Sequence, residues 1–195
     1  MMMPALVVLA IGACARSISS PGAEEADPNL KQLFEVLLAD RVNVVDGFPA
    51  GDYVVVVTDS IAFCQSKDDC LTTRSDLEGI ETFAAEPNGL RERLISENQS
   101  SKPLAISDRR ARLISAPELR RIFSGKGWWE EFYRLYPKSR GYLEFGKPVF
   151  SNDGNHALVY LSHVCGGLCG SAWLYHLEKR NQRWQIAGAK MVWIS

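Results

Sequence analysis

Hydrophobic residues recur at helical spacing in the first part of the chain. Leucine and phenylalanine occupy every third or fourth position from Leu30 to Leu38, which predicts a helix with one apolar face. Asp27 is a preferred N-cap residue and Pro28 suits a first helical turn, so this helix should begin at Pro28. Residues 53–58, YVVVVT, are mostly β-branched and predict a strand that is buried on both faces.

Three shorter helices are expected in the middle of the chain. An apolar repeat predicts one over Leu90–Ile95. Ser115 followed three residues later by Glu118 is a capping-box pattern, which predicts a helix through about Phe123. The segment WWEEFYRL, residues 128–135, predicts the third helix, which Pro137 should end.

From Gly141 onward the hydrophobic period changes to two. Strands are expected over residues 142–150, 157–164, 171–177 and 184–194, separated by short turns. Pro148 cannot donate a hydrogen bond to a neighbouring strand, so the first strand is expected at an edge of the sheet. The predicted fold class is α+β, with N-terminal helices packed on a C-terminal antiparallel β-meander of about four strands. The aromatic residues of these strands could line a pocket or pack as core.

The N-terminus has the pattern of an export signal. Pro4–Ala13 is an uncharged apolar run of a length that suits a signal peptide but is too short to span a membrane. Cys14 lies where a bacterial lipoprotein carries its lipidated cysteine, although no Lys or Arg precedes the run. We therefore expect a signal peptide or lipoprotein leader over 1–14, a flexible tether over 15–27 and a single α+β domain over 28–195. The alternative for the apolar run is a buried N-terminal strand.

Four cysteines remain beyond the leader, and an even number favours disulfides in an exported protein. The expected pairs are Cys64–Cys70 and Cys165–Cys169, because each pair brackets one short loop. A four-thiolate zinc site or a redox pair is the alternative, although neither spacing is the C-x2-C that is usual for such sites.

The chain contains three histidines and no complete catalytic motif. If Cys165 faces Cys169 across the turn, His163 faces Ser171 and His176 lies on the opposite face of the sheet, which argues against a shared metal site. No cofactor and no metal are therefore expected. Residues 141–147, GYLEFGK, match the start of a P-loop, but the next residue is proline and the segment is expected to be a strand. If the protein is an enzyme, the candidate site lies at the Cys165–Cys169 turn and uses His163 or Ser171.

The formal net charge is -1, which gives no general electrostatic case for binding nucleic acid. From about residue 90 to 195 the chain resembles an uncharacterised group of bacterial exported proteins. The matching residues are Asn98, Trp129, Phe132, Tyr136, Pro137, Gly141, residues 157–160, residues 167–170, Trp184 and residues 193–195. The order of the elements is also similar to α+β cone folds of the cystatin or nuclear-transport-factor-like kind. The resemblance to the exported proteins implies export but no activity, and the similarity to the cone folds implies no function.

We therefore expect a non-enzymatic module of the cell envelope that binds an unknown protein or small ligand. The expected location is the periplasm or the outer membrane, with a lipid anchor as the membrane tether, or alternatively a secreted form. An enzyme of the cell envelope is the alternative function.

Overall fold

The computed structural model describes residues 27–43, 53–66, 69–70 and 83–195. The helices in this part of the chain are α1 (Pro28–Asn43), α2 (Leu90–Glu97), α3 (Ala116–Phe123) and α4 (Trp128–Leu135). The strands are β1 (Tyr53–Val57), β2 (Cys64–Ser66), β3 (Asp69–Cys70), β4 (Ala111–Ile114), β5 (Ser139–Phe145), β6 (Val149–Phe150), β7 (His156–Gly166), β8 (Cys169–Arg180) and β9 (Arg183–Ile194).

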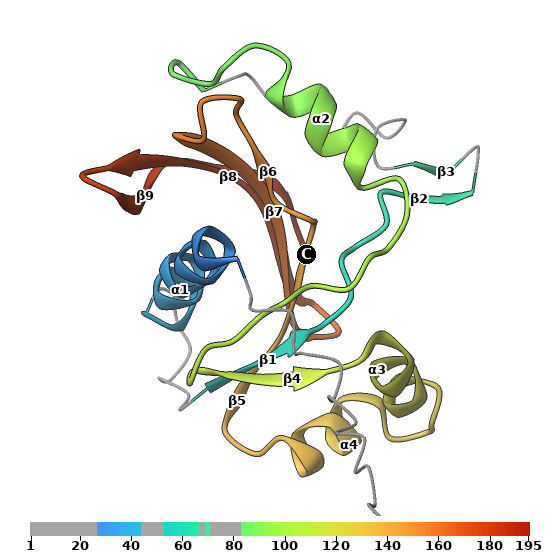
Figure 1. Cartoon of the computed structure of the whole chain (residues 1–195). Coiled ribbons are helices and arrows are strands. Elements are labelled where there is room, and N and C mark those ends of the chain that lie inside the picture. The colour runs from blue at the N-terminus through green and yellow to red at the C-terminus, as the bar shows by residue number, and fades with distance from the viewer. Residues whose placement is uncertain (1–26, 44–52, 67–68, 71–82) are drawn as a thin grey trace, which may run out of the picture.

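The main sheet of the described residues is mixed and has seven strands, so the expected four-stranded antiparallel meander is wrong. Its order is β4-β1-β5-β7-β8-β9, and β6 pairs with β7 beside this path. Strand β1 runs parallel to both β4 and β5, whereas β5, β7, β8 and β9 pair antiparallel in sequence order. The helices and the sheet still make an α+β fold (Figure 1).

The parallel part of the sheet explains the error. Strand β1 is buried along its whole length, as expected, and such a strand shows no alternation that would identify its neighbours. Strand β4 has only four residues and pairs only with β1 among the described strands. Arg112 within it looks like part of a charged loop, but its guanidinium lies over the ring of Tyr53 at 4.1 Å from the centroid.

The position expected for the first strand of the meander is also wrong. Strand β5 lies between β1 and β7 rather than at an edge of the sheet. Pro148 falls after β5 has ended and before β6 begins, so it interrupts no hydrogen-bond ladder of β5. The following turns lie close to the expected positions, and residues 141–145 form a strand rather than a phosphate-binding loop.

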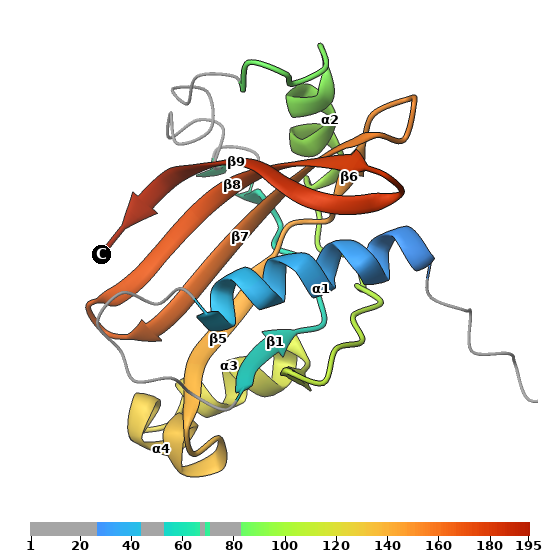
Figure 2. The same cartoon turned by 90° about the vertical axis from the view of Figure 1, so that its left-hand side faces the viewer.

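Helices pack on both faces of the sheet. Helix α1 covers one face (Figure 2). Its leucines pack against inward residues of β1, β5, β7 and β8. Helix α2 packs over one part of the opposite face, and α3 and α4 pack over the part formed by β1 and β5. Alternate residues of each long strand therefore enter different cores. The same alternation decides on which face of the sheet each polar side chain described below lies.

The expected helix starts are confirmed. Asp27 Oδ1 accepts a hydrogen bond from Asn29 N at 2.9 Å at the start of α1, and Ser115 Oγ accepts one from Glu118 N at 3.3 Å at the start of α3. The leader over 1–14 and the tether up to residue 26 lie outside the described residues. No helix of the described part is long and apolar enough to cross a membrane.

Candidate functional site

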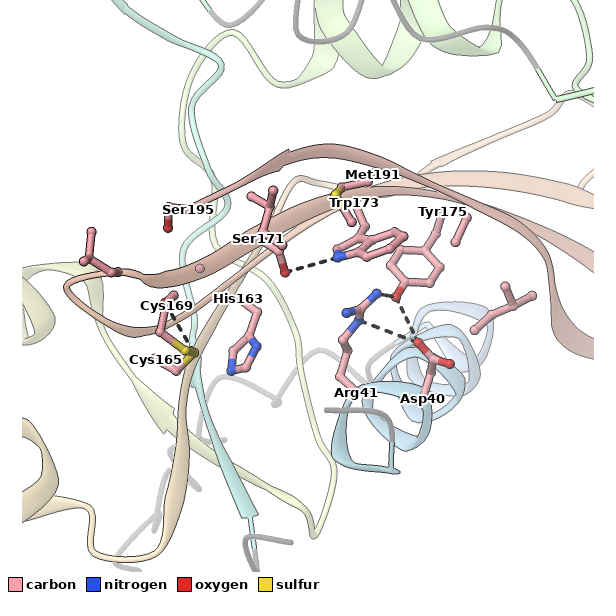
Figure 3. A pocket seen from close by; sticks show the side chains of 15 residues that line it. Asp40, Arg41, His163, Cys165, Cys169, Ser171, Trp173, Tyr175, Met191 and Ser195 are labelled. Carbon is pink, nitrogen blue, oxygen red and sulfur yellow. Dashed lines mark hydrogen bonds and ion pairs between the residues drawn. A yellow bond between two sulfur atoms is a disulfide. The ribbon is translucent and has the colours of Figure 1, made fainter. Parts of the chain in front are cut away.

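A cleft of 530 Å³ lies on the face of the sheet that α1 covers, beyond the C-terminal end of that helix (Figure 3). Its sheet side is formed by alternate residues of β7, β8 and β9, and α1 contributes Asp40 and Arg41. A cleft of this size is typical of small-molecule sites, which commonly occupy about 300–1,000 Å³. The cleft contains the four residues expected at the turn: His163, Cys165, Cys169 and Ser171.

The turn between β7 and β8 is closed by a disulfide between Cys165 and Cys169, as expected. The Cα atoms of the two cysteines are 5.1 Å apart, which is within the usual range for a disulfide. Tyr133 of α4 donates a hydrogen bond from its hydroxyl to the Cys165 carbonyl at 2.9 Å. The turn at this end of the cleft is therefore fixed by the disulfide and hydrogen bonded to α4.

The side chains of the other expected pair lie outside the described residues. The backbone of the two-stranded sheet β2–β3 does place Cys64 directly opposite Cys70. The Cys64–Cys70 disulfide stays a prediction.

The register expected for the two long strands is confirmed. His163 pairs with Ser171, and Leu158 pairs with His176. The expected facing of Cys165 and Cys169 is not seen, because an irregularity between Val164 and Gly166 places Gly166 opposite Cys169. This irregularity lies beyond His163, so it does not change the register of the histidine. His163 consequently enters the cleft, whereas His176 lies on the opposite face of the sheet.

His163 is buried, and its Nε2 atom is hydrogen bonded to the backbone carbonyl of Arg140. Since a carbonyl can only accept, Nε2 carries the hydrogen and Nδ1 of the neutral ring is an acceptor. Burial lowers the pKa of His163, and the positive charges of Arg41 and Arg140 act in the same direction, whereas the hydrogen bond to the Arg140 carbonyl opposes this shift. The net effect favours the neutral ring.

Support for this carbonyl comes from a close approach between β5 and β7. Gly141 has a φ of +81°, and a Cβ built on it would lie 2.2 Å from the Val164 carbonyl oxygen. Only glycine can occupy this position without moving a strand. The adjacent Arg140 carbonyl is thereby held against His163.

Arg41 contacts Trp173, Tyr175 and Asp40 within the cleft (Figure 3). Its guanidinium lies over the rings of Trp173 and Tyr175, at 4.9 and 5.1 Å from their centroids. One nitrogen donates to the Tyr175 hydroxyl, which in turn donates to Asp40 Oδ2 at 2.9 Å. Burial lowers the pKa of Arg41, and the Asp40 carboxylate 3.6 Å from its Nε opposes that effect.

Apolar side chains at the mouth of the cleft are unusually exposed. Leu168 is 91% exposed, Ile194 is 70% exposed and Met191 is 44% exposed. Single exposed hydrophobic residues are common, but these three border one concave site. The cleft therefore combines an apolar mouth with a hydrogen-bonding interior.

The two candidate catalytic residues are neighbours without a hydrogen bond between them among the described contacts. Ser171 Oγ accepts a hydrogen bond from Trp173 Nε1 at 3.1 Å, and the His163 ring is directed to Arg140. Covalent catalysis needs a base within hydrogen-bond reach of the nucleophile and a group that orients the base. In the described residues the orienting partner of His163 is the backbone carbonyl of Arg140 rather than a carboxylate.

Sequence reasoning found one side of this cleft and missed the other. The turn cysteines, His163 and Ser171 were expected together because strand register relates them. Asp40 and Arg41 were missed because they lie near the C-terminal end of α1, far in sequence from the strands that form the rest of the cleft. The only signal was a charged pair at the end of an apolar helical repeat, which is common on surfaces.

The comparisons with known proteins leave the resemblance to bacterial exported proteins a prediction. No protein-family model, no curated protein and no solved structure matches the chain.

Proposed function

We propose that this protein is a non-enzymatic module of the cell envelope that binds a small amphipathic carboxylate in the cleft beside α1. The observation that supports this most directly is the position of Arg41, held over Trp173 and Tyr175 at the inner end of a cleft with an apolar mouth. The guanidinium is a suitable partner for a carboxylate, and the exposed apolar residues suit an aliphatic chain.

The donors in the cleft favour an acceptor head group. The Ser171 hydroxyl oxygen accepts a hydrogen bond from Trp173 Nε1, and among the described residues the hydroxyl hydrogen has no acceptor, so it can donate to a ligand. Arg41 Nη1 likewise makes no hydrogen bond with the described residues. A carboxylate can accept from both groups and carries a charge opposite to that of the guanidinium, whereas an alcohol lacks the charge and an ammonium cannot accept.

The proposal is tested with three ligands of equal chain length. Isothermal titration calorimetry on the full chain compares decanoate, decanol and decylammonium, each below its micelle concentration. We expect decanoate to bind and Arg41→Gln to raise its Kd at least about tenfold, equivalent to about 1.4 kcal/mol. Ser171→Ala should raise the Kd less, because it removes one neutral donor.

The matched control is Arg134→Gln, which removes an exposed arginine that is paired with Glu131 on α4. This variant should bind decanoate as the unmodified protein does. Equal affinity for decanoate and decylammonium, or an unchanged Kd in Arg41→Gln, would show that Arg41 does not recognise a head group.

We also propose that the protein is exported and tethered through a lipid on Cys14, in the periplasm or at the outer membrane. The apolar run before Cys14 supports this proposal. Labelling cells with a radioactive fatty acid should mark the protein, and Cys14→Ser should abolish the label. Retention of the label in Cys14→Ser would exclude this anchor.

The alternative proposal is an envelope enzyme that uses His163 or Ser171. The described hydrogen bonds favour binding over this alternative, because each residue is directed to a different partner. Turnover in a broad hydrolase screen that is lost in both Ser171→Ala and His163→Gln would support the enzyme and contradict the binding module.

A further inference from the structure

A second cluster of polar side chains lies on the other face of the sheet. His156 of β7 pairs directly with Glu178 of β8, and His176 is two residues before Glu178 on the same face of β8. One Nδ1 or Nε2 atom of each histidine and one carboxylate oxygen of Glu178 all lie within 4.8 Å of one another. We propose that these three residues bind a divalent transition-metal ion, with Zn²⁺ as the best match.

The separation of the two histidines supports a common ion. His156 Nδ1 and His176 Nε2 are 3.1 Å apart. Two nitrogen ligands of a tetrahedral Zn²⁺, each about 2.0–2.1 Å from the ion, are about 3.3 Å apart. The two nitrogens are therefore close to the separation of a ligand pair. The two rings lie nearly parallel, with planes 9° apart, so at least one ring must turn for both nitrogens to face the ion. The hydrogen they share would move to the other nitrogen of its ring, so that both lone pairs face the ion.

The third ligand has a free oxygen in this arrangement. Glu178 Oε2 accepts both hydrogen bonds from Arg180, at 3.2 and 2.9 Å. Glu178 Oε1 accepts no hydrogen bond from the described residues. The Arg180 side chain is 66% exposed, so it can turn into solvent when a metal ion neutralises the carboxylate.

Neighbouring residues hold His176 in place. The ring of Phe83 packs against the His176 ring with centroids 5.3 Å apart. Phe83 fits there because the residue opposite His176 on β9 is Gly188, where a Cβ would lie 2.7 Å from the Phe83 ring. Well-positioned ligands bind a metal more tightly because less side-chain freedom is lost.

The site is accessible from one side. His156 also lines a pocket of 420 Å³ between the start of α2 and the turn at residues 151–153. Three protein ligands leave a fourth position of Zn²⁺ for water or a small ligand, and the pocket lies beside one of the three, His156.

Metal binding is tested directly with Zn²⁺ on the full chain after chelation and removal of the chelator. Calorimetry should show one equivalent with a Kd below about 10 µM. Removing any one ligand should weaken binding at least about tenfold, since loss of a residue that only orients a ligand by hydrogen bonding already costs about 10–100-fold. Glu178→Gln and His156→Ala are the main variants, because these two side chains are only partly buried.

His163→Gln is the matched control, because His163 is the remaining histidine of the chain and lies on the opposite face of the sheet. It should retain full Zn²⁺ affinity. Circular dichroism confirms that each variant is folded before its affinity is compared.

Co²⁺ distinguishes this site from a cysteine site. Nitrogen and oxygen ligands should give only weak visible bands, whereas thiolates add intense near-ultraviolet charge-transfer bands. Thiolate bands, an unchanged Kd in His156→Ala and Glu178→Gln, or no binding at 1 mM Zn²⁺ would each overturn the proposal.

Discussion

Replacing Gly141 by alanine tests the close approach of β5 and β7 that supports the cleft. Two costs combine at this position. A non-glycine residue at a φ of +81° costs roughly 1–2 kcal/mol. The added Cβ would also lie 2.2 Å from the Val164 carbonyl oxygen and 2.7 Å from the Cys165 Cα, and both of these atoms belong to backbone.

The second cost is the larger one. The strands must separate by about 1 Å to reach ordinary contact, and overpacking of this kind typically costs about 1–3 kcal/mol. We therefore expect Gly141→Ala to lower the free energy of unfolding by about 2–5 kcal/mol. Urea unfolding followed by far-ultraviolet circular dichroism measures this value by linear extrapolation.

Gly154→Ala is the control, because it shares the first cost without the second. Gly154 has a φ of +70°, and a Cβ there would meet no atom within 4 Å. This variant should lose about 1–2 kcal/mol. If the two variants lose the same free energy, the close approach of β5 and β7 contributes nothing and our account of Gly141 is wrong.

Three further predictions concern stability. Replacing Cys165 and Cys169 together by alanine should cost about 2 kcal/mol in urea unfolding, as expected for a loop of this length, and no loss would contradict a disulfide. Asn98→Asp should cost about 1–3 kcal/mol, because the buried Asn98 amide donates to the Lys147 carbonyl at 3.0 Å and a carboxylate cannot donate. An Asn98→Asp variant as stable as the unmodified chain would refute that reasoning. Burial lowers the pKa of His163 in the folded chain below its unfolded value of about 6.5, so the unfolded state binds more protons. The free energy of unfolding should therefore fall as the pH decreases from about 7 to 5, and this fall should be smaller in His163→Gln.

Local features of the fold could be predicted because their causes are local. The start of α1 follows from Asp27, whose side chain accepts a hydrogen bond from the first turn. The start of α3 follows in the same way from Ser115. The register expected for β7 and β8 holds from His156 to Val164, because strand pairing repeats in steps of one residue. The assumption behind it fails at the turn itself, where Gly166, not Cys165, pairs with Cys169.

The same register could have located the His156–Glu178 pair. A pairing that places Leu158 opposite His176 also places His156 opposite Glu178. The expectation from the sequence concerned only His163 and His176, and those two residues do lie on opposite faces of the sheet. His156 lies directly opposite Glu178, and His176 is the diagonal neighbour of His156 on the same face.

The sequence by itself determined the helix starts, the strands of the C-terminal half, and the cysteine turn, since each depends on residues close together in the chain. Only the tertiary structure decided that β1 pairs in parallel with β4 and β5 and so extends the sheet. A fully buried strand has no alternation of polar and apolar residues from which its neighbours could be predicted. The tertiary structure likewise decided that Arg41 of α1 meets Trp173 of β8. That contact depends on where a helix end comes to lie on a sheet, and packing of the whole core sets that position.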